Sequence, residues 1–89
     1  MKNFFQIADE AKNAVNEKFT HTEVTTNNWN DKRIYVNKPY ESAAYKNVGY
    51  VRTSDGAVFP ACGDKVRTSR DREAIEILNV VSEILIANK

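Results

Sequence analysis

The sequence predicts an α+β fold in which two helices pack on one face of an antiparallel sheet. Three observations lead to this prediction: an amphipathic segment near each end of the chain, β-rich segments between them, and turn-forming residues that separate those segments. The expected order of elements is α-β-β-β-β-α. With 89 residues, the chain is expected to form one small domain over residues 1–89.

The first helix is expected between Asn3 and about Phe19. Its apolar residues recur at three- and four-residue steps, which places them on one helical face: Phe4, Ile7, Ala8, Ala11, Val15 and Phe19. Asn3 is the expected N-cap. Gln6 follows three residues later, where a capping box has its second member.

Four strands are expected between the helices, in segments rich in Thr, Val, Ile and Tyr. They cover residues 22–26, 32–37, 48–53 and 57–61. Pro39 follows the second strand, because proline cannot donate to a sheet ladder. Residues 40–46 leave two interpretations open, a helical turn or an irregular crossing.

Two hairpins connect these strands in the prediction. Asn27–Asp31 is expected to be the loop of the first hairpin, because Asn and Asp tolerate left-handed backbone and bond their own main chain. Ser54, Asp55 and Gly56 are expected to form the turn of the second. Asp-Gly between β-rich segments is typical of such a turn.

The longest helix is expected from about Arg70 to Ala87, with Thr68 or Ser69 as its N-cap. Its core stripe consists of Ala74, Ile77, Leu78, Val81, Ile84 and Leu85. A second stripe at helical spacing consists of Ile75, Asn79, Ser82 and Ile86. We expect this second stripe either to bind a partner, including a second copy of the chain, or to pack against the first helix.

Composition and charge exclude several classes of protein. Thirteen Lys and Arg against twelve Asp and Glu give a net charge of +1, which excludes an acidic DNA mimic and a strongly basic histone-like binder. No apolar run approaches the ~20 residues of a membrane span, and the first residues lack the apolar stretch of a signal peptide. With a single cysteine, we expect a cytoplasmic protein.

Catalytic and metal-binding residues are not expected. Cys62 and His21 are the only cysteine and histidine, too few for a structural zinc site. They leave a Cys–His nucleophile pair arithmetically possible, but Cys62 is more typical of a small buried side chain at a strand end. The sequence has no glycine-rich phosphate loop, paired-histidine motif or Gly-x-Ser-x-Gly elbow. We therefore expect no enzyme and no cofactor.

Basic and aromatic residues gather in the middle of the chain. Residues 32–72 contain nine basic and four acidic side chains. Strand alternation places Arg33, Tyr35, Tyr50 and Arg52 on the sheet face that the helices leave open. Exposed rings beside arginines are what single-stranded RNA or DNA binds, although the same residues suit any solvated sheet face.

A second basic group surrounds the start of the last helix. Arg67, Arg70 and Arg72 flank a helix N-terminus, where main-chain N–H groups favour an anion. The alternative is neutralisation by the nearby acids Asp64, Asp71 and Glu73.

The order of the helices and this basic helix start resemble the double-stranded-RNA-binding domain in topology. That family carries a Gly-Pro-x-His loop and a Lys-Lys-x-Ala-Lys start to its final helix. Here the corresponding stretch is Ser69–Ala74, with the sequence SRDREA, and the loop has no counterpart. The resemblance therefore identifies no family.

Trp29 is the only tryptophan, and it is expected at a loop tip between Asn28 and Asn30. A loop tryptophan outside any apolar run is typical of a binding anchor, because tryptophan is enriched in interface hot spots. The alternative is that its ring folds back over the sheet edge to complete a thin core.

These observations favour a small binding protein that docks on a host protein or nucleoprotein complex and modulates or inhibits it. Trp29, Asn28, Asn30, Ile75 and Ile86 are the expected partner contacts. In size and lack of catalytic motifs the chain is similar to phage and mobile-element inhibitors such as anti-CRISPR proteins. The alternative is an RNA or single-stranded DNA binder that uses Arg33, Tyr35, Tyr50, Arg52, Arg67 and Arg70.

Overall fold

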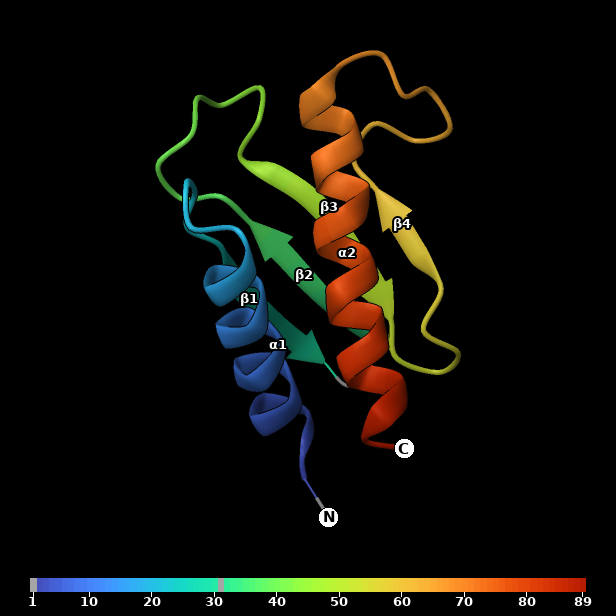
Figure 1. The fold of residues 1–89 in the computed structure, drawn as a ribbon. Helices are drawn as coiled ribbons and strands as arrows, with labels where there is room; N and C mark the ends of the chain where they lie inside the picture. The colour runs from blue at the N-terminus through green and yellow to red at the C-terminus, as the bar shows by residue number, and fades with distance from the viewer. Residues whose placement is uncertain (1, 31) are drawn as a thin grey trace.

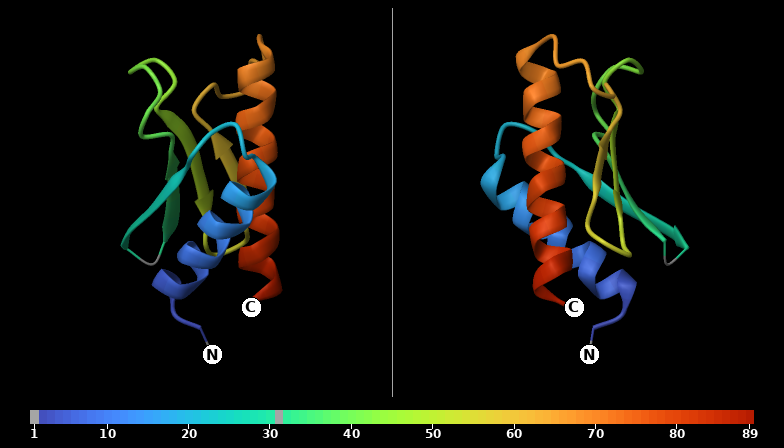
Figure 2. Two further views of the ribbon diagram at one scale, coloured as in Figure 1. Left: turned by 60° about the vertical axis from the view of Figure 1, so that its left-hand side comes forward. Right: turned by 90° about the vertical axis from the view of Figure 1, so that its right-hand side faces the viewer.

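Two helices lie on the same face of a four-stranded antiparallel sheet in the computed structural model, which describes residues 2–30 and 32–89 (Figure 1). The elements are α1 (Phe4–Lys18), β1 (Thr25–Asn30), β2 (Arg33–Asn37), β3 (Asn47–Arg52), β4 (Val58–Pro60) and α2 (Ser69–Ala87). The other face of the sheet is open, as the side views show (Figure 2). The predicted α+β fold and its order of elements are confirmed.

Both helices begin at a capping box. The side chain of Asn3 accepts a hydrogen bond from the Gln6 main-chain N–H, and the Gln6 side chain accepts one from the Asn3 N–H, each at 2.9 Å. At α2, Thr68 and Asp71 form the same reciprocal pair. These bonds satisfy N–H groups that have no partner within a helix, so the sequence itself sets where each helix starts.

The strands follow one another in space in the order β1-β2-β3-β4. The predicted Asp-Gly turn joins β3 to β4: Gly56 has φ +74°, and the Arg52 N–H donates to the Ala57 carbonyl at 2.9 Å. Residues 40–46 form turns and bends instead of a helix, which agrees with the irregular crossing.

The first strand begins later along the chain than predicted and extends further at its C-terminal end. β1 runs through Asn27, Asn28 and Trp29, so the loop predicted over 27–31 is wrong for residues 27–30, and Asp31 lies outside the described residues. Register against β2 shifts between Asn27 and Asn30. Pairing with β2 and burial of Asn28 outweigh the local preference of Asn for turns.

The core lies between the helices and the covered face of the sheet. It consists of Ile7, Ala8, Ala11, Val15, Phe19, Val24, Ile34, Val36, Val48, Val51, Ile77, Leu78, Val81 and Leu85. Gly49 allows α2 to approach the sheet: a Cβ there would lie 2.8 Å from Leu78 Cδ1 and 2.4 Å from the Phe59 carbonyl oxygen. In the described chain, neither helix has the length and apolarity needed to cross a membrane.

Candidate functional site

The open face of the sheet carries paired arginines and tyrosines. In the ladder between β2 and β3, Arg33 lies opposite Arg52, and Tyr35 lies opposite Tyr50. Their neighbours along the strands, such as Ile34 and Val51, are fully buried against the helices. Strand alternation therefore places the four side chains together on the face that no helix covers.

Aromatic rings and guanidinium groups form a continuous layer on this face. The rings of Tyr50 and Phe59 stack with their centroids 4.8 Å apart and an interplanar angle of 13°. Arg33 lies 4.6 Å from the centre of the Tyr50 ring, and Arg52 lies 5.2 Å from that of Phe59. Arg33 also donates a hydrogen bond to the Tyr35 hydroxyl at 3.2 Å. These contacts hold the long arginine side chains flat on the sheet.

The two arginines differ in their charge partners. Arg52 donates through Nε to Asp55 Oδ1 at 2.9 Å, and this side-chain hydrogen bond holds the pKa of Asp55 far below its ordinary value. Arg33 has no carboxylate partner among the described residues. Its pKa is raised, first by the hydrogen bond to the Tyr35 hydroxyl. Arg33 is therefore the cation of this face that a partner's acidic group can meet.

Trp29 extends the same face to its β1 edge. Its side chain is 77% exposed, so the alternative in which it completes the core is wrong. It also lies on a strand, not at the predicted loop tip. Trp29 lines a shallow groove of about 640 Å³ together with Asn27, Tyr35, Asn37 and Asn47. This groove has aromatic walls and three carboxamides, with no charged side chain.

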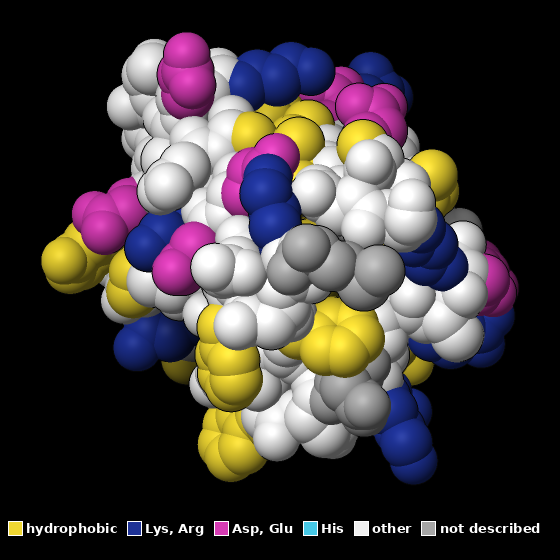
Figure 3. Space-filling view, turned by 90° about the horizontal axis from the view of Figure 1, so that it is seen from below, with side chains coloured by type: hydrophobic (Ala, Val, Ile, Leu, Met, Phe, Trp, Pro, Cys, Tyr) yellow, Lys and Arg dark blue, Asp and Glu magenta, His cyan; other side chains and the backbone are white. Residues whose placement is uncertain are grey.

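The two residues beside Trp29 differ in their accessibility. Asn28 is 9% exposed, so its side chain offers little surface to a partner. Asn30 is exposed, and its Oδ1 accepts a hydrogen bond from the Lys32 N–H at 2.8 Å. At the end of the molecule where both chain termini lie, hydrophobic side chains stand at the surface among basic and acidic ones (Figure 3).

The second stripe of α2 contacts the β3–β4 turn. Ser82 is buried and donates a hydrogen bond to the Gly56 carbonyl at 2.6 Å. A Cβ on Gly56 would lie 2.9 Å from Ile86 Cδ1, so Ile86 packs closely on the same turn while staying 54% exposed. Ile75 is half-buried. This stripe therefore packs in part against the turn, a contact that neither interpretation of the sequence predicts.

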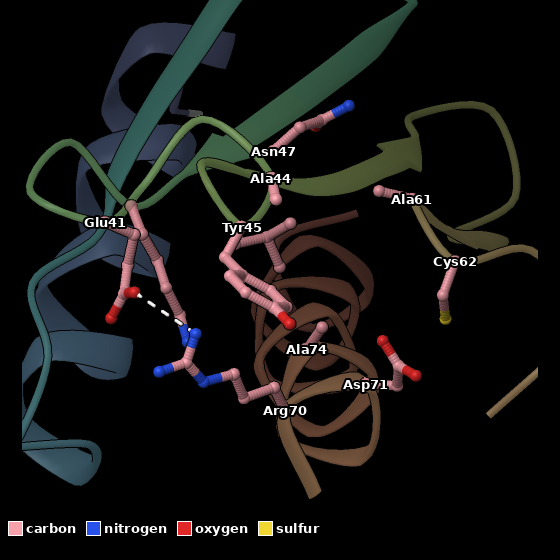
Figure 4. Close-up of a pocket in the computed structure, with 11 residues that line it drawn as sticks. Glu41, Ala44, Tyr45, Asn47, Ala61, Cys62, Arg70, Asp71 and Ala74 are labelled. Atoms are coloured by element: carbon pink, nitrogen blue, oxygen red, sulfur yellow. Dashed lines mark ion pairs between the residues drawn. The ribbon is translucent and has the colours of Figure 1, made fainter. Parts of the chain in front are cut away.

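At the start of α2, Asp71 binds main-chain N–H groups, and Arg70 is the arginine that pairs with an acidic side chain. The Asp71 carboxylate accepts from the Arg67 N–H at 2.9 Å and the Thr68 N–H at 3.1 Å, and these bonds lower its pKa. Arg70 lies 3.8 Å from the Glu41 carboxylate and 4.3 Å from the centre of the Tyr45 ring. Figure 4 shows Arg70 between these two side chains at a pocket of about 150 Å³.

Cys62 and His21 do not form a catalytic pair in this structure. Cys62 lines the pocket of Figure 4, and its Sγ lies 3.7 Å from the Gly63 carbonyl oxygen. His21 lines a neighbouring groove, and its Nε2 lies 2.8 Å from Glu73 Oε2. Among the described residues, no group of three or more Cys, His, Asp or Glu side chains is placed to hold a metal ion.

Two features of the site were missed in the sequence. The sequence predicts Phe59 only as a strand residue, whereas its position opposite Tyr50 adds a third ring to the layer. The signal was present, because side chains alternate between the two faces of a strand, and Phe59 lies between Val58 and Pro60. In the sequence Lys38 is one of the basic residues of the middle segment, and only the fold brings it to Glu73, 35 positions away in the chain.

Comparison with known proteins assigns no family: no family model matches the chain, and the searches of curated proteins and of solved structures give no significant match.

Proposed function

We propose that this chain is a non-enzymatic binding protein that docks on another protein, alone or within a nucleoprotein complex, through the open face of its sheet. The observation that carries the proposal is the exposed Trp29 side chain, which shares this face with the arginine and tyrosine layer. Trp, Tyr and Arg dominate the binding energy of protein interfaces. Lys, Asp and Glu, which interface cores avoid, do not occur in the four strands.

Preorganisation of the layer supports binding to a protein surface. Arg33 and Arg52 already lie on the Tyr50 and Phe59 rings, so little side-chain freedom is left to lose when a partner docks. The same contacts cover ring faces that nucleic-acid bases would need for stacking. The Arg33 guanidinium has five N–H donors, and one of them binds the Tyr35 hydroxyl. The remaining donors can bind a carboxylate of a partner.

In this proposal, docking is itself the activity. The protein acts by covering a surface that its partner needs, in the manner of small phage-encoded inhibitors. We place the partner in the cytoplasm, since a chain with one cysteine gains no disulfide from an oxidising compartment.

Affinity capture from nuclease-treated lysate tests the proposal. Trp29→Ala and Arg33→Ala each remove one component of the open face, and both are expected to reduce partner recovery at least tenfold. Tyr40→Ala is the matched control, because Tyr40 is an 83% exposed aromatic side chain that lines a groove beside His21 and not the open face. Equal recovery with all three variants would contradict the proposal.

Binding of single-stranded nucleic acid is the second candidate. The observation that favours it is that the only charged side chains in the strands are Arg33 and Arg52, both beside aromatic rings. Affinity for a single-stranded oligonucleotide would then fall steeply between about 50 and 200 mM salt, with a smaller slope for Arg52→Ala. Flat salt dependence or absence of binding would count against this candidate.

A further inference from the structure

The Trp29 groove reaches across three strands of the open face, which no helix covers (Figure 2). Asn27 and Trp29 come from β1, Tyr35 and Asn37 from β2, and Asn47 from β3. Neighbouring strands of a sheet lie about 4.8 Å apart, so the groove spans roughly 10 Å. One turn of a polyproline helix has three residues and rises about 9 Å. The groove therefore has the width for about one such turn laid across the strands.

The lining of the groove favours a segment with few main-chain N–H groups. Main-chain groups of a sheet bond to neighbouring strands in its plane, so a segment that lies on the face meets side chains only. The groove offers three carboxamides, whose NH2 groups can donate to the carbonyls of such a segment. Proline brings a carbonyl but no N–H, so it leaves no buried donor without a partner. The largely exposed ring of Trp29 gives a flat apolar surface on which a proline ring can pack.

A cation stands beside the Tyr35 wall of this groove. The Tyr35 hydroxyl accepts a hydrogen bond from Arg33 Nη1 at 3.2 Å, and the Arg33 guanidinium lies 4.6 Å from the centre of the Tyr50 ring. These contacts restrain an exposed side chain that no carboxylate of the described chain pairs with. Arg52, the other arginine of the face, is already paired with Asp55. Charge complementarity therefore favours one acidic side chain next to the residues that occupy the groove.

We propose that the open face binds a proline-containing extended segment of the partner, with proline in the Trp29 groove and a neighbouring acidic side chain on Arg33. This inference rests on the proposed docking function and names the segment that the partner presents. A polyproline conformation has no internal hydrogen bonds and little freedom to lose, so a short segment can bind to a shallow groove. An oligosaccharide would also use rings and carboxamides, but a neutral one would leave Arg33 without a partner.

Fluorescence anisotropy with synthetic peptides tests the proposal on the full chain. The probe is a labelled peptide with a run of prolines between two glutamates, so that either direction of the peptide places an acid near Arg33. A peptide with lysines in place of the glutamates tests the charge. A peptide with the same glutamates around a glycine–serine run tests the prolines. We expect the proline–glutamate peptide to bind about tenfold more tightly than either control, or better.

Variants of the chain locate the bound peptide. Trp29→Ala is expected to weaken binding of the proline–glutamate peptide about tenfold, and Tyr40→Ala is the matched control that keeps it. Arg33→Glu is expected to reverse the charge preference, so that the lysine peptide binds more tightly than the glutamate peptide. Because this is a gain of binding, a variant that fails to fold cannot produce it. Emission of Trp29, the only tryptophan, is expected to change on saturation with unlabelled peptide.

The inference is overturned if the proline–glutamate peptide shows no saturable binding, if the glycine–serine peptide binds equally well, or if Arg33→Glu leaves the charge preference unchanged. Binding of a neutral chito-oligosaccharide in place of the peptide, with a change in Trp29 emission, would assign the groove to a sugar instead. Lysate capture separates these failures from failure of the proposed function. If capture still depends on Trp29 and Arg33 while the peptide does not bind, docking stands and only the chemistry of the segment is wrong.

Discussion

The ammonium nitrogen of Lys38 lies 2.9 Å from Oε1 of Glu73, which joins the end of β2 to the early turns of α2. The Lys38 side chain is only 9% exposed. The other Glu73 oxygen lies 2.8 Å from His21 Nε2, so one carboxylate connects three segments of the chain. This cluster holds together the end of the sheet where the pocket lies. Lys38 and Arg70 both line that pocket.

Glu73→Gln is expected to lower the free energy of unfolding by about 2 kcal/mol, because it leaves the buried Lys38 charge without a carboxylate. Denaturant titration measures the change. Glu76→Gln on the exposed face of the same helix is the control, with an expected change below about 0.5 kcal/mol. Equal effects of the two substitutions would show that the ion pair contributes no stability.

The stability of the protein is expected to fall in acid partly through Glu73. Burial by itself raises the pKa of this carboxyl, but hydrogen bonds from Lys38 and His21 outweigh it and hold the pKa below its ordinary value of 4.5. The folded state then binds fewer protons than the unfolded state, so stability rises with pH in this range and is lost as pH falls. Between about pH 5 and 3, the loss is expected to be smaller in Glu73→Gln than in the unmodified chain. An identical pH dependence would contradict this assignment.

Gly49 and Gly63 both have positive φ, but only Gly49 is also closely packed. Gly49→Ala is expected to cost more than about 3 kcal/mol, since its φ of +140° is unfavourable for a side chain and its Cβ would also lie 2.4 Å from the Phe59 carbonyl oxygen. Gly63→Ala is expected to cost about 1 kcal/mol, because its φ of +67° is unfavourable but nothing lies within 4 Å. Comparable losses in thermal unfolding would show that Gly49 does not set the distance between α2 and the sheet.

Trp29→Ala is expected to leave the free energy of unfolding within about 0.5 kcal/mol of the unmodified chain at low protein concentration, because the side chain is 77% exposed. Ile34→Ala, which removes a side chain with no exposed area, is the reference and is expected to cost about 3 kcal/mol. A large loss from Trp29→Ala would mean that this residue serves the core and not a partner.

The parts of the fold that depend on local chemistry were predictable from the sequence. Asn3 with Gln6 marks the start of α1, and Asp55 with Gly56 marks the β3–β4 turn, because each acts on main-chain groups within four residues. The apolar stripe of each helix follows from its spacing.

The parts that depend on distant contacts were not predictable. Asn28 belongs to a turn-prone segment, yet it is buried in a strand because β2 pairs beside it. Lys38 appears solvated in the sequence, and only the fold brings Glu73 to it. The open face was predictable as an alternation of side chains, but the contact of Arg33 with Tyr50 depends on the register between β2 and β3.

Site-specific photocrosslinking tests the docking face most directly. A photoreactive amino acid at Asn47 would lie on the groove of the open face, and one at Glu76 would lie on the exposed side of α2. In nuclease-treated lysate of cells that encode this chain, position 47 is expected to give a crosslinked protein that position 76 does not, and Arg33→Ala is expected to abolish it. Crosslinks from position 76 alone, or from position 47 regardless of Arg33, would contradict docking through this face.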